Sequence, residues 1–401
     1  MTSEEIKQLH ETYVMPTYAP GLALVRGEGT RVWDAEGRDY LDFVAGIAVA
    51  GVGHCHPRLV EAIREQAGRL MHVSNLYFND RQPELARALS LRSLGGKCFF
   101  CNSGAEANEA LIKLARKWGA EQGRYEVVSF RNSFHGRTLA TLTATGQDKV
   151  KLGFDPLPEG FVLADLNDLG SVEAALTGRT AAVLIEAVQG EGGVQAAAAE
   201  FLADLRRLCD ERGILLLCDE VQCGMGRTGE WFGYQTAGIT PDAISVAKGM
   251  GGGFPIGGIC AGPDLSDVLG VGSHATTFGG TPLACAAALA VMEIIEKENL
   301  LKNARVMGER LRQGMAPLVN KYDWVEGVRG QGLINGLVLS RPAFSLQRMA
   351  EEKGLLVLAT ANTVIRLVPP LTVTEREIDQ AVRTLHEVCA EMEPIREEAG
   401  A

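Results

Sequence analysis

The stretch Ile214-Leu215-Leu216-Leu217-Cys218-Asp219-Glu220 decides the fold, because five uninterrupted apolar residues run directly into two acids. Continuous apolar runs of this length are typical of parallel strands that are covered on both faces. A second run, Ala243-Ile244-Ser245-Val246-Ala247, ends at Lys248 and is followed by glycines. In open parallel sheets, ligands bind beyond the carboxyl ends of the strands. We therefore expect Asp219 and Lys248 to face one pocket.

The alternative to a binding site is a purely structural role, in which Asp219 and Lys248 form a buried ion pair that only supports the fold. Burying two opposite charges gains little net stability, because both lose their hydration. Glycines beside the strand ends are a poor setting for a purely structural pair. A site is therefore the better interpretation of the two charges.

Strand and helix patterns alternate through the middle of the chain, which indicates a mostly parallel α/β sheet. The expected strands are 97–101, 127–130, 181–185, 214–218 and 243–247. The expected helices include 60–72, 83–94, 105–118 and 201–212. Both ends of the chain carry patterns of an α+β domain. We predict a large domain of residues 66–290 and a small domain built from residues 1–65 and 291–401.

The composition is that of an ordinary globular enzyme, with 401 residues of which 46% are hydrophobic and 22% charged. A formal net charge of -11 argues against a nucleic-acid partner, because phosphate binding needs a basic face. Nine cysteines, an odd number, argue against a disulfide framework and favour a reducing compartment. The N-terminus lacks an apolar signal core, and no apolar stretch is long enough to cross a bilayer. We expect a cytoplasmic protein with no membrane partner.

Further candidate residues lie at the ends of predicted strands. Asn102-Ser103-Gly104-Ala105 leads into a helix N-terminus, which favours a phosphate, although a plain N-cap explains the same residues. Phe134-His135-Gly136-Arg137 could stack on a flat ring and bind a carboxylate, or belong to core and surface. Glu186 and Glu191 flank a glycine-rich turn. Arg366, on a predicted strand, needs a carboxylate from the protein or from a substrate.

Three other motifs are discounted. Gly224-Met225-Gly226-Arg227-Thr228-Gly229 matches the dinucleotide fingerprint of an NAD-dependent dehydrogenase, but no periodic helix follows, and the next strand ends in Lys248 instead of an acid. Cys98 and Cys101 point to opposite faces of a strand and lack a second pair. His54-Cys55-His56-Pro57 lacks further ligands at metal spacing. We expect no metal.

In their order along the chain, these motifs resemble those of the class III, pyridoxal-phosphate-dependent aminotransferases. The matching segments are 102–109, 134–137, 186–193, 219–222 and 248–249, and the similarity runs over nearly the whole chain. The resemblance implies the fold-type I architecture of pyridoxal-phosphate-dependent transferases, with pyridoxal 5'-phosphate as the cofactor.

The resemblance also implies roles for single residues at the cofactor. Lys248 would hold the cofactor through a Schiff base and move protons, and Asp219 would pair with the pyridinium nitrogen. The remaining contacts would come from Ser103, Gly104 and Ala105 at the phosphate, Phe134 and Val221 on the two ring faces, and Gln222 at the ring hydroxyl. Thr277 of a second subunit would also reach the phosphate, which implies an obligate homodimer. Ala105 stands where a Thr is common, so one hydroxyl contact is missing.

Substrate contacts follow from the same resemblance. Arg137 would bind the α-carboxylate of the amino donor. Arg366 would bind a carboxylate of 2-oxoglutarate and pair with Glu191 when that substrate is absent. The loop shape around Tyr18, Asn75 and Ala275 would set the donor preference, so Tyr18 is included among the substrate-binding residues.

The reaction implied is transfer of the terminal amino group of N2-acetylornithine to 2-oxoglutarate, giving N-acetylglutamate 5-semialdehyde and glutamate. Ornithine, succinylornithine, 4-aminobutyrate and a lysine-pathway donor remain alternatives within the family. Outside it, the alternatives are the NAD-dependent dehydrogenase and a non-catalytic carrier of the cofactor. A carrier does not need the substrate arginines, Arg137 and Arg366, that this chain has.

Overall fold

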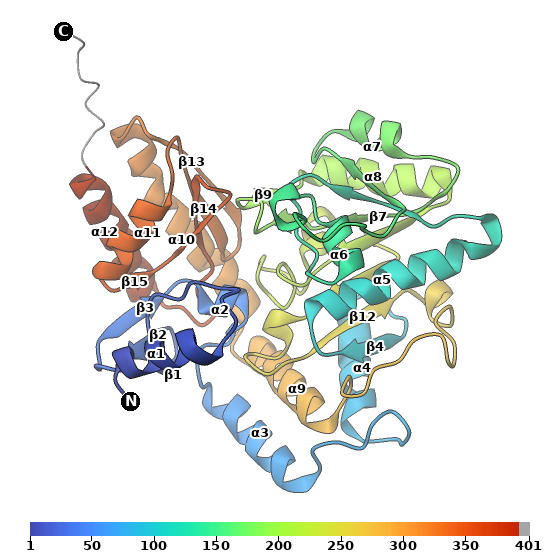
Figure 1. Cartoon of the computed structure of the whole chain (residues 1–401), viewed down its shortest axis with the longest axis horizontal. Helices are drawn as coiled ribbons and strands as arrows, with labels where there is room; N and C mark the ends of the chain where they lie inside the picture. The colour runs from blue at the N-terminus through green and yellow to red at the C-terminus, as the bar shows by residue number, and fades with distance from the viewer. Residues whose placement is uncertain (393–401) are drawn as a thin grey trace.

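A seven-stranded sheet lies at the centre of the larger part of the molecule in the computed structural model, which describes residues 1–392 (Figure 1). In spatial order its strands are β4 (Cys98–Cys101), β12 (Gly257–Ala261), β11 (Ala243–Val246), β10 (Leu215–Asp219), β7 (Thr180–Ile185), β5 (Glu126–Phe130) and β6 (Phe161–Ala164). Neighbouring strands from β11 to β6 are parallel, and β12 is antiparallel to both of its neighbours. The predicted mostly parallel α/β sheet is confirmed.

Helices cover both faces of this sheet, as the unbroken apolar strands require. Leu215 and Leu217 of β10 pack in one buried cluster with residues of α5 (Gly104–Gly119). Leu216 and Cys218 belong to a second cluster, which includes residues of α8 (Ala199–Arg212). Successive side chains of a strand point to opposite faces, so one run of five apolar residues supplies both cores.

Two more helices agree with predicted ones to within a few residues, α3 (Pro57–Arg69) and α4 (Arg81–Arg92). The remaining helices of this part are α6 (Leu139–Ala144), α7 (Leu169–Ala175) and α9 (Pro282–Lys297). A short hairpin, β8 (Val188–Gln189) and β9 (Gln195–Ala196), carries the turn that contains Glu191.

Two four-stranded sheets lie beside the large one, on the side where Figure 1 shows the first and last elements of the chain together. The first consists of β1 (Leu24–Glu28), β2 (Arg31–Asp34), β3 (Asp39–Asp42) and β15 (Leu355–Leu356), and the second of β13 (Val325–Gln331), β14 (Ile334–Leu339), β17 (Val364–Leu367) and β16 (Leu358–Thr360). The accompanying helices are α1 (Ser3–Tyr13), α2 (Ala45–Ala48), α10 (Leu300–Lys321), α11 (Phe344–Glu352) and α12 (Glu375–Glu391).

One strand pair joins the two ends of the chain. β15 lies parallel to β3, with Leu355 opposite Leu41, so an N-terminal sheet takes its last strand from the C-terminal part. The domain boundaries near residues 65 and 290 stay predictions. Residues 393–401 of the predicted C-terminal part lie outside the residues that the structure describes. Within residues 1–392, no helix is long and apolar enough to span a membrane.

Candidate active site

A cavity of about 220 Å³ lies where β10 and β11 end, and it contains most of the predicted site residues. Its lining consists of Gly104, Ala105, Asn108, Phe134, His135, Gly136, Arg137, Glu186, Glu191, Asp219, Val221, Gln222 and Lys248. We call this space the inner cavity. Asp219 is the last residue of β10, and Lys248 comes two residues after β11, so the parallel pairing of these strands brings both to one edge. The pairing is the physical reason why residues far apart in the sequence share the cavity.

Four groups hold the Asp219 carboxylate, which is almost completely buried. His135 Nδ1 lies 2.8 Å and Asn108 Nδ2 2.7 Å from Oδ2, and the Val221 backbone N–H donates to Oδ1 at 3.0 Å. Ser245 Oγ lies 3.4 Å from Oδ1 and donates to Asn108 Oδ1 at 2.6 Å. An ionised carboxylate only accepts hydrogen bonds, so His135 carries its proton on Nδ1. The network fixes the orientation of a negative charge at the bottom of the inner cavity.

Lys248 is half-buried and opens the short 3-10 helix η4 (Lys248–Met250) with a positive φ of 44°. That conformation costs a non-glycine residue about 1 kcal/mol or more and is typical of functional positions. Loss of hydration lowers the pKa of Lys248 below its ordinary value, and the attraction of Glu191 is too weak to restore it. Within residues 1–392, no ion pair or hydrogen bond joins Lys248 to Asp219, so the two charges are not a structural pair.

Arg366 is completely buried and meets Glu191 at the wall of the inner cavity. Its Nη1 donates to Glu191 Oε1 at 2.6 Å and lies 3.4 Å from Gln222 Oε1. Burial would raise the pKa of Glu191, but the charge and hydrogen bond of Arg366 outweigh it and lower that pKa. The Nε and Nη2 atoms of Arg366 and the Nε2 atom of Gln222 are buried without a partner in the described part of the chain. Unpaired buried donors are costly, and they are the groups that a bound anion would satisfy.

Glu186 adds a second buried carboxyl group to the inner cavity. Burial raises its pKa well above the ordinary value, and the charge of Asp219 raises it further. The Phe134 backbone N–H donates to Glu186 Oε2 at 3.0 Å. This bond connects Glu186 to the aromatic residue that was predicted to stack on the cofactor.

The N-terminus of α5 forms another wall. Ser103 is its N-cap, and its Oγ accepts from the Glu106 backbone N–H at 3.2 Å. The first N–H groups of a helix have no partner within it, so Gly104 and Ala105 present donors to the inner cavity. Gly104 is required here because a Cβ would lie 2.7 Å from Val221 Cγ1. Arg137 is exposed at the mouth, with its Cζ 5.4 Å from the centre of the Phe134 ring.

Four predicted site residues do not line the inner cavity of this chain. Ser103 and Arg366 lie directly behind its walls, as the N-cap of α5 and the partner of Glu191, whereas Tyr18 and Thr277 lie elsewhere. Tyr18 is 82% exposed and lines a separate groove formed with α1. Thr277 is exposed on the segment that precedes α9. The expected role of Thr277 concerns a second subunit, so it stays a prediction, as does that of Tyr18.

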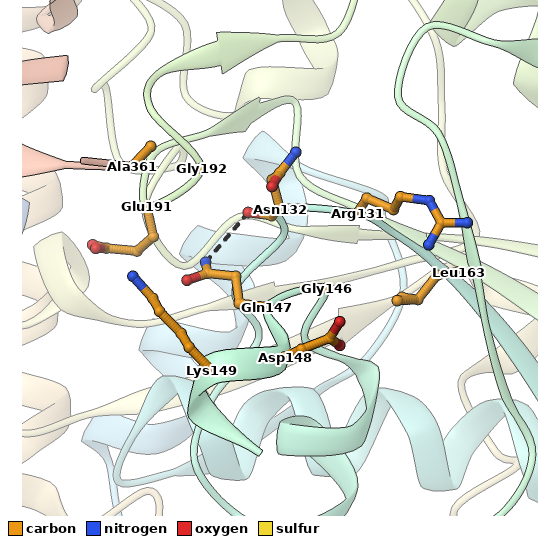
Figure 2. Close-up of a pocket in the computed structure, with 10 residues that line it drawn as sticks. All are labelled: Arg131, Asn132, Gly146, Gln147, Asp148, Lys149, Leu163, Glu191, Gly192 and Ala361. Carbon is orange, nitrogen blue, oxygen red and sulfur yellow. Dashed lines mark hydrogen bonds between the residues drawn. The ribbon is translucent and has the colours of Figure 1, made fainter. Parts of the chain in front are cut away.

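An outer cavity of about 490 Å³ adjoins the inner one, and Glu191 lines both (Figure 2). Its other lining residues are Arg131, Asn132, Gly146, Gln147, Asp148, Lys149, Leu163, Gly192 and Ala361. Glu191 therefore separates the buried arginine Arg366 from a space that opens to solvent.

The residues that position Asp219 were not assigned a role from the sequence. Asn108 is the clearest case, because it is a buried amide on the otherwise apolar inner face of α5. A buried polar residue in an apolar stripe needs a partner, and this was the available signal. His135 was considered only as a stacking group, and Ser245 only as a strand residue. Both contact Asp219, from which they are 84 and 26 residues apart in the sequence.

The dinucleotide fingerprint does not open an α-helix; only the short 3-10 helix η3 (Gly233–Ala237) follows it. Residues 224–229 form turns, and Gly229 packs instead against Arg305 of α10. The dehydrogenase alternative therefore lacks the helix N-terminus that would hold a pyrophosphate.

Comparison with known proteins decides the family. The model of the family "Aminotransferase class-III" matches residues 14–389. The chain belongs to the class-III aminotransferase family. It is 50% identical over 385 residues to the acetylornithine aminotransferase of Caldanaerobacter subterraneus subsp. tengcongensis, covering 95% of this chain and 98% of that protein. The expected pyridoxal-phosphate-dependent aminotransferase of fold-type I is confirmed at the level of the family.

Other relatives of this aminotransferase also cover nearly the whole chain. The acetylornithine aminotransferase of Methanocaldococcus jannaschii is 45% identical over 400 residues, which is 98% of this chain and 100% of that protein. Among solved structures, the acetylornithine aminotransferase of Elizabethkingia anophelis matches with a TM-score of 0.87 and 33% identity, covering 98% of this chain and all of that one. The ornithine aminotransferase of Toxoplasma gondii ME49 matches with a TM-score of 0.94 and 32% identity, covering 97% and 95%.

The inner cavity fits the cofactor of this aminotransferase family. It contains a lysine for the aldehyde, a fixed carboxylate for the ring nitrogen, and a helix N-terminus for the phosphate. The buried, unpaired Nε2 of Gln222 is a donor available for the ring hydroxyl. The absence of a Cβ at Gly104 keeps Val221 close to the start of α5.

Proposed function

We propose that this aminotransferase transfers the terminal amino group of N2-acetylornithine to 2-oxoglutarate, giving N-acetylglutamate 5-semialdehyde and glutamate. The observation that carries the proposal is Arg366, a buried guanidinium with two unpaired nitrogens that contacts Glu191 and Gln222, two residues that line the inner cavity with Lys248 and Asp219. A buried arginine of this kind favours a substrate carboxylate. The relatives named acetylornithine aminotransferase, at 45% to 50% identity over nearly the whole chain, support the donor.

Each residue of the inner cavity then has a chemical task. Lys248 would bond to the cofactor and, once released, move a proton at the reacting carbon, because its lowered pKa favours the neutral amine. Asp219 would hold a proton on the ring nitrogen, with its orientation fixed by His135 and Asn108. The cofactor, when bound, supplies the electron sink for the carbanion. Phe134 and Val221 would hold the ring between them, and Gln222 would donate to its hydroxyl.

Substrate binding would divide between two arginines. Arg137, at the mouth of the inner cavity, would bind the α-carboxylate of the donor, so that the terminal amine reaches Lys248. Arg366 would bind a carboxylate of 2-oxoglutarate in the second half-reaction, after Glu191 leaves it. Tyr18, which lines the separate groove formed with α1, would contribute to donor selection.

The same proposal includes a homodimer in the cytoplasm. Exposed apolar side chains gather in two segments, 70–78 and 271–278, which meet where the His72 and Phe278 rings lie 5.2 Å apart. Large exposed apolar patches mark interaction sites. Thr277 lies in this patch, in accord with its proposed contact to the phosphate in a partner subunit. The odd number of cysteines supports a reducing compartment.

The test is conversion of N-acetylornithine and 2-oxoglutarate by the purified protein with pyridoxal phosphate, followed by chromatography of both products. Parallel assays in which ornithine, succinylornithine or 4-aminobutyrate replaces N-acetylornithine compare the rates with the four amino donors. Lys248→Ala should abolish turnover, because no other amine lines the inner cavity within the described chain. Turnover of Lys248→Ala at the wild-type rate, or a clear preference for another donor, would contradict the proposal.

A further inference from the structure

Glu191 must leave Arg366 whenever a substrate carboxylate binds there, and this requirement rests on the proposed function. The Arg366 Nη1 atom that binds Glu191 is buried, so a second carboxylate at the same guanidinium would place two negative charges side by side without water. The displaced carboxylate needs both space and a new counter-charge. Without them, the binding of 2-oxoglutarate would be opposed by the cost of an unpaired charge.

The backbone of Glu191 cannot supply this movement. Thr360 Oγ1 donates to the Glu191 carbonyl oxygen at 2.7 Å, and Arg329 Nε donates to the Gly193 carbonyl oxygen at 2.8 Å. Between them, Gly192 is packed so closely that a Cβ would lie 2.5 Å from the Asn132 carbonyl oxygen. The turn is therefore fixed on both sides, and only the side chain of Glu191 is free to rotate.

The outer cavity offers the space. Glu191 lines it as well as the inner cavity, and 27% of the Glu191 side chain is exposed in the position that meets Arg366. A rotation about its side-chain bonds can move the carboxylate from the buried guanidinium into a space of about 490 Å³. The carboxylate regains water there, so the remaining question is its counter-charge.

Two cations line the outer cavity, and only one is available to Glu191. Figure 2 shows the Lys149 side chain extending toward Glu191, whereas the Arg131 guanidinium lies on the far side, beside Leu163. Arg131 already pairs with Asp165 at 2.9 Å. The neighbouring acid Asp148 lies 3.9 Å from Lys151. In the described residues, Lys149 has no ion-pair partner.

We propose that Lys149 is the second partner of Glu191, receiving its carboxylate in the outer cavity when 2-oxoglutarate occupies Arg366. Lys149 is then a positioning residue that acts only in the second half-reaction. Glu191 alternates between the buried Arg366 and the solvated Lys149. 2-Oxoglutarate can then bind Arg366 while the displaced Glu191 carboxylate remains paired. Lys149 stays protonated while Glu191 changes partner, and no covalent bond is made or broken.

The experiment isolates the second half-reaction. The cofactor-free chain is loaded with pyridoxamine phosphate, and its single-turnover reaction with 2-oxoglutarate is followed by stopped-flow absorbance. Lys149→Gln should raise the apparent Kd for 2-oxoglutarate about two- to fivefold, the size expected for a partly exposed ion pair. Lys149→Arg should restore it. The first half-reaction, with N-acetylornithine and the pyridoxal form, should be unchanged in both variants.

Two controls separate the proposal from general attraction of an anionic substrate. Arg131→Gln removes the same charge from the same cavity on the side away from Glu191, and it should have no effect. In a Glu191→Gln background, Lys149→Gln should add nothing, because the neutral amide has no charge for Lys149 to receive. Equal effects of the Lys149 and Arg131 variants, or an additive effect with Glu191→Gln, would overturn the proposal.

A failure of the proposed function is seen separately. Loading with pyridoxamine phosphate needs no amino donor, so the Lys149 test remains valid if N-acetylornithine is not the substrate. If the wild-type enzyme reacts with 2-oxoglutarate but not with N-acetylornithine, only the proposed donor is disproved. An unchanged Kd in Lys149→Gln, with a wild-type first half-reaction, would reject the role of Lys149 alone.

Discussion

At the scale of single residues, Arg366 has the most demanding environment in the site. It is completely buried, and its only charged partner in the described chain is Glu191. Truncating one member of a buried, hydrogen-bonded charge pair costs about 2 to 4 kcal/mol, which is roughly 30- to 1000-fold in binding. Arg366→Gln should therefore weaken 2-oxoglutarate binding by this factor, while the reaction of the pyridoxal form with N-acetylornithine changes much less.

Separate titration of the two half-reactions measures this asymmetry. A uniform loss in both would mean that Arg366 supports the architecture of the inner cavity and not the acceptor. Arg137→Gln is the matched variant, since it removes an arginine from the mouth and should raise the KM for the donor instead.

Lys248 gives a prediction about pH. Its pKa is lowered from 10.5, chiefly by burial, so the neutral amine is present at pH values where a free lysine is still charged. Reaction of the cofactor-free chain with pyridoxal phosphate should therefore increase with pH along a curve whose midpoint lies below 10.5, measured from the rate at which the yellow absorbance band appears. A midpoint at or above 10.5 would contradict the lowered pKa.

The same shift fixes the sign of a stability effect. Between the lowered pKa of the folded chain and 10.5, the unfolded chain binds more protons at this lysine than the folded chain does. Stability must then rise with pH across that window. In urea unfolding of the cofactor-free chain, Lys248→Met should reduce this rise of the unfolding free energy with pH. The pH dependence that carboxyl groups cause at acid pH should stay the same.

At the scale of the element, the start of α5 depends on one glycine. A Cβ at Gly104 would lie 2.7 Å from Val221 Cγ1, so Gly104→Ala must displace Val221 or the helix N-terminus. Both would contact the cofactor, and we expect about tenfold weaker binding of pyridoxal phosphate, or roughly 1.4 kcal/mol, with the fold retained. Equilibrium dialysis of the cofactor measures it.

Gly68→Ala is the control for this change. Gly68 is also helical, in α3, and nothing lies within 4 Å of its Cβ position, so alanine there should leave cofactor binding unaltered. Its effect on stability should be favourable by about 0.5 to 1 kcal/mol, because alanine is the better helix former. Equal cofactor affinities in the two variants would show that the contact with Val221 is not important.

The strands with strong apolar runs were predictable, and so were the residues at their ends. Residues 214–218 became β10 (Leu215–Asp219), with Asp219 and Lys248 in one cavity as expected. β12 was missed because Gly257-Gly258 at its start carries no apolar signal, although β12 separates β4 from the other strands. The helix α1 was missed because it buries no residue, while the Thr2 and Glu5 capping box that starts it is a local signal.

The partners of Asp219 could not be predicted for a different reason. Asn108, His135 and Ser245 come from a helix, a loop and a strand, and their meeting depends on the order of strands in the sheet. Neither spacing nor periodicity encodes that order. The family resemblance supplied single-residue roles, whereas the hydrogen-bond network around them required the folded chain.

At the scale of the whole molecule, the apolar patch formed by residues 70–78 and 271–278 makes the strongest prediction. Phe78 is fully exposed, and it lines a cavity of about 910 Å³ together with Ala275 and Thr276. An aromatic side chain that residues 1–392 leave uncovered is typical of a subunit interface. Phe78→Asp should place a charge in that interface and convert the proposed dimer to a monomer, as measured by light scattering with size-exclusion chromatography.

The monomer should also lose affinity for pyridoxal phosphate, because Thr277 lies in the same patch and would no longer reach the phosphate of a partner subunit. Phe344→Asp is the matched control: Phe344 is 60% exposed on α11, in the C-terminal part of the chain, so this variant should remain a dimer with normal cofactor affinity. If the Phe78→Asp protein remains a dimer, the subunit interface lies elsewhere on the molecule. A monomer that binds the cofactor as tightly as the wild type would retain the interface but remove Thr277 from the phosphate site, so the two measurements test assembly and site separately.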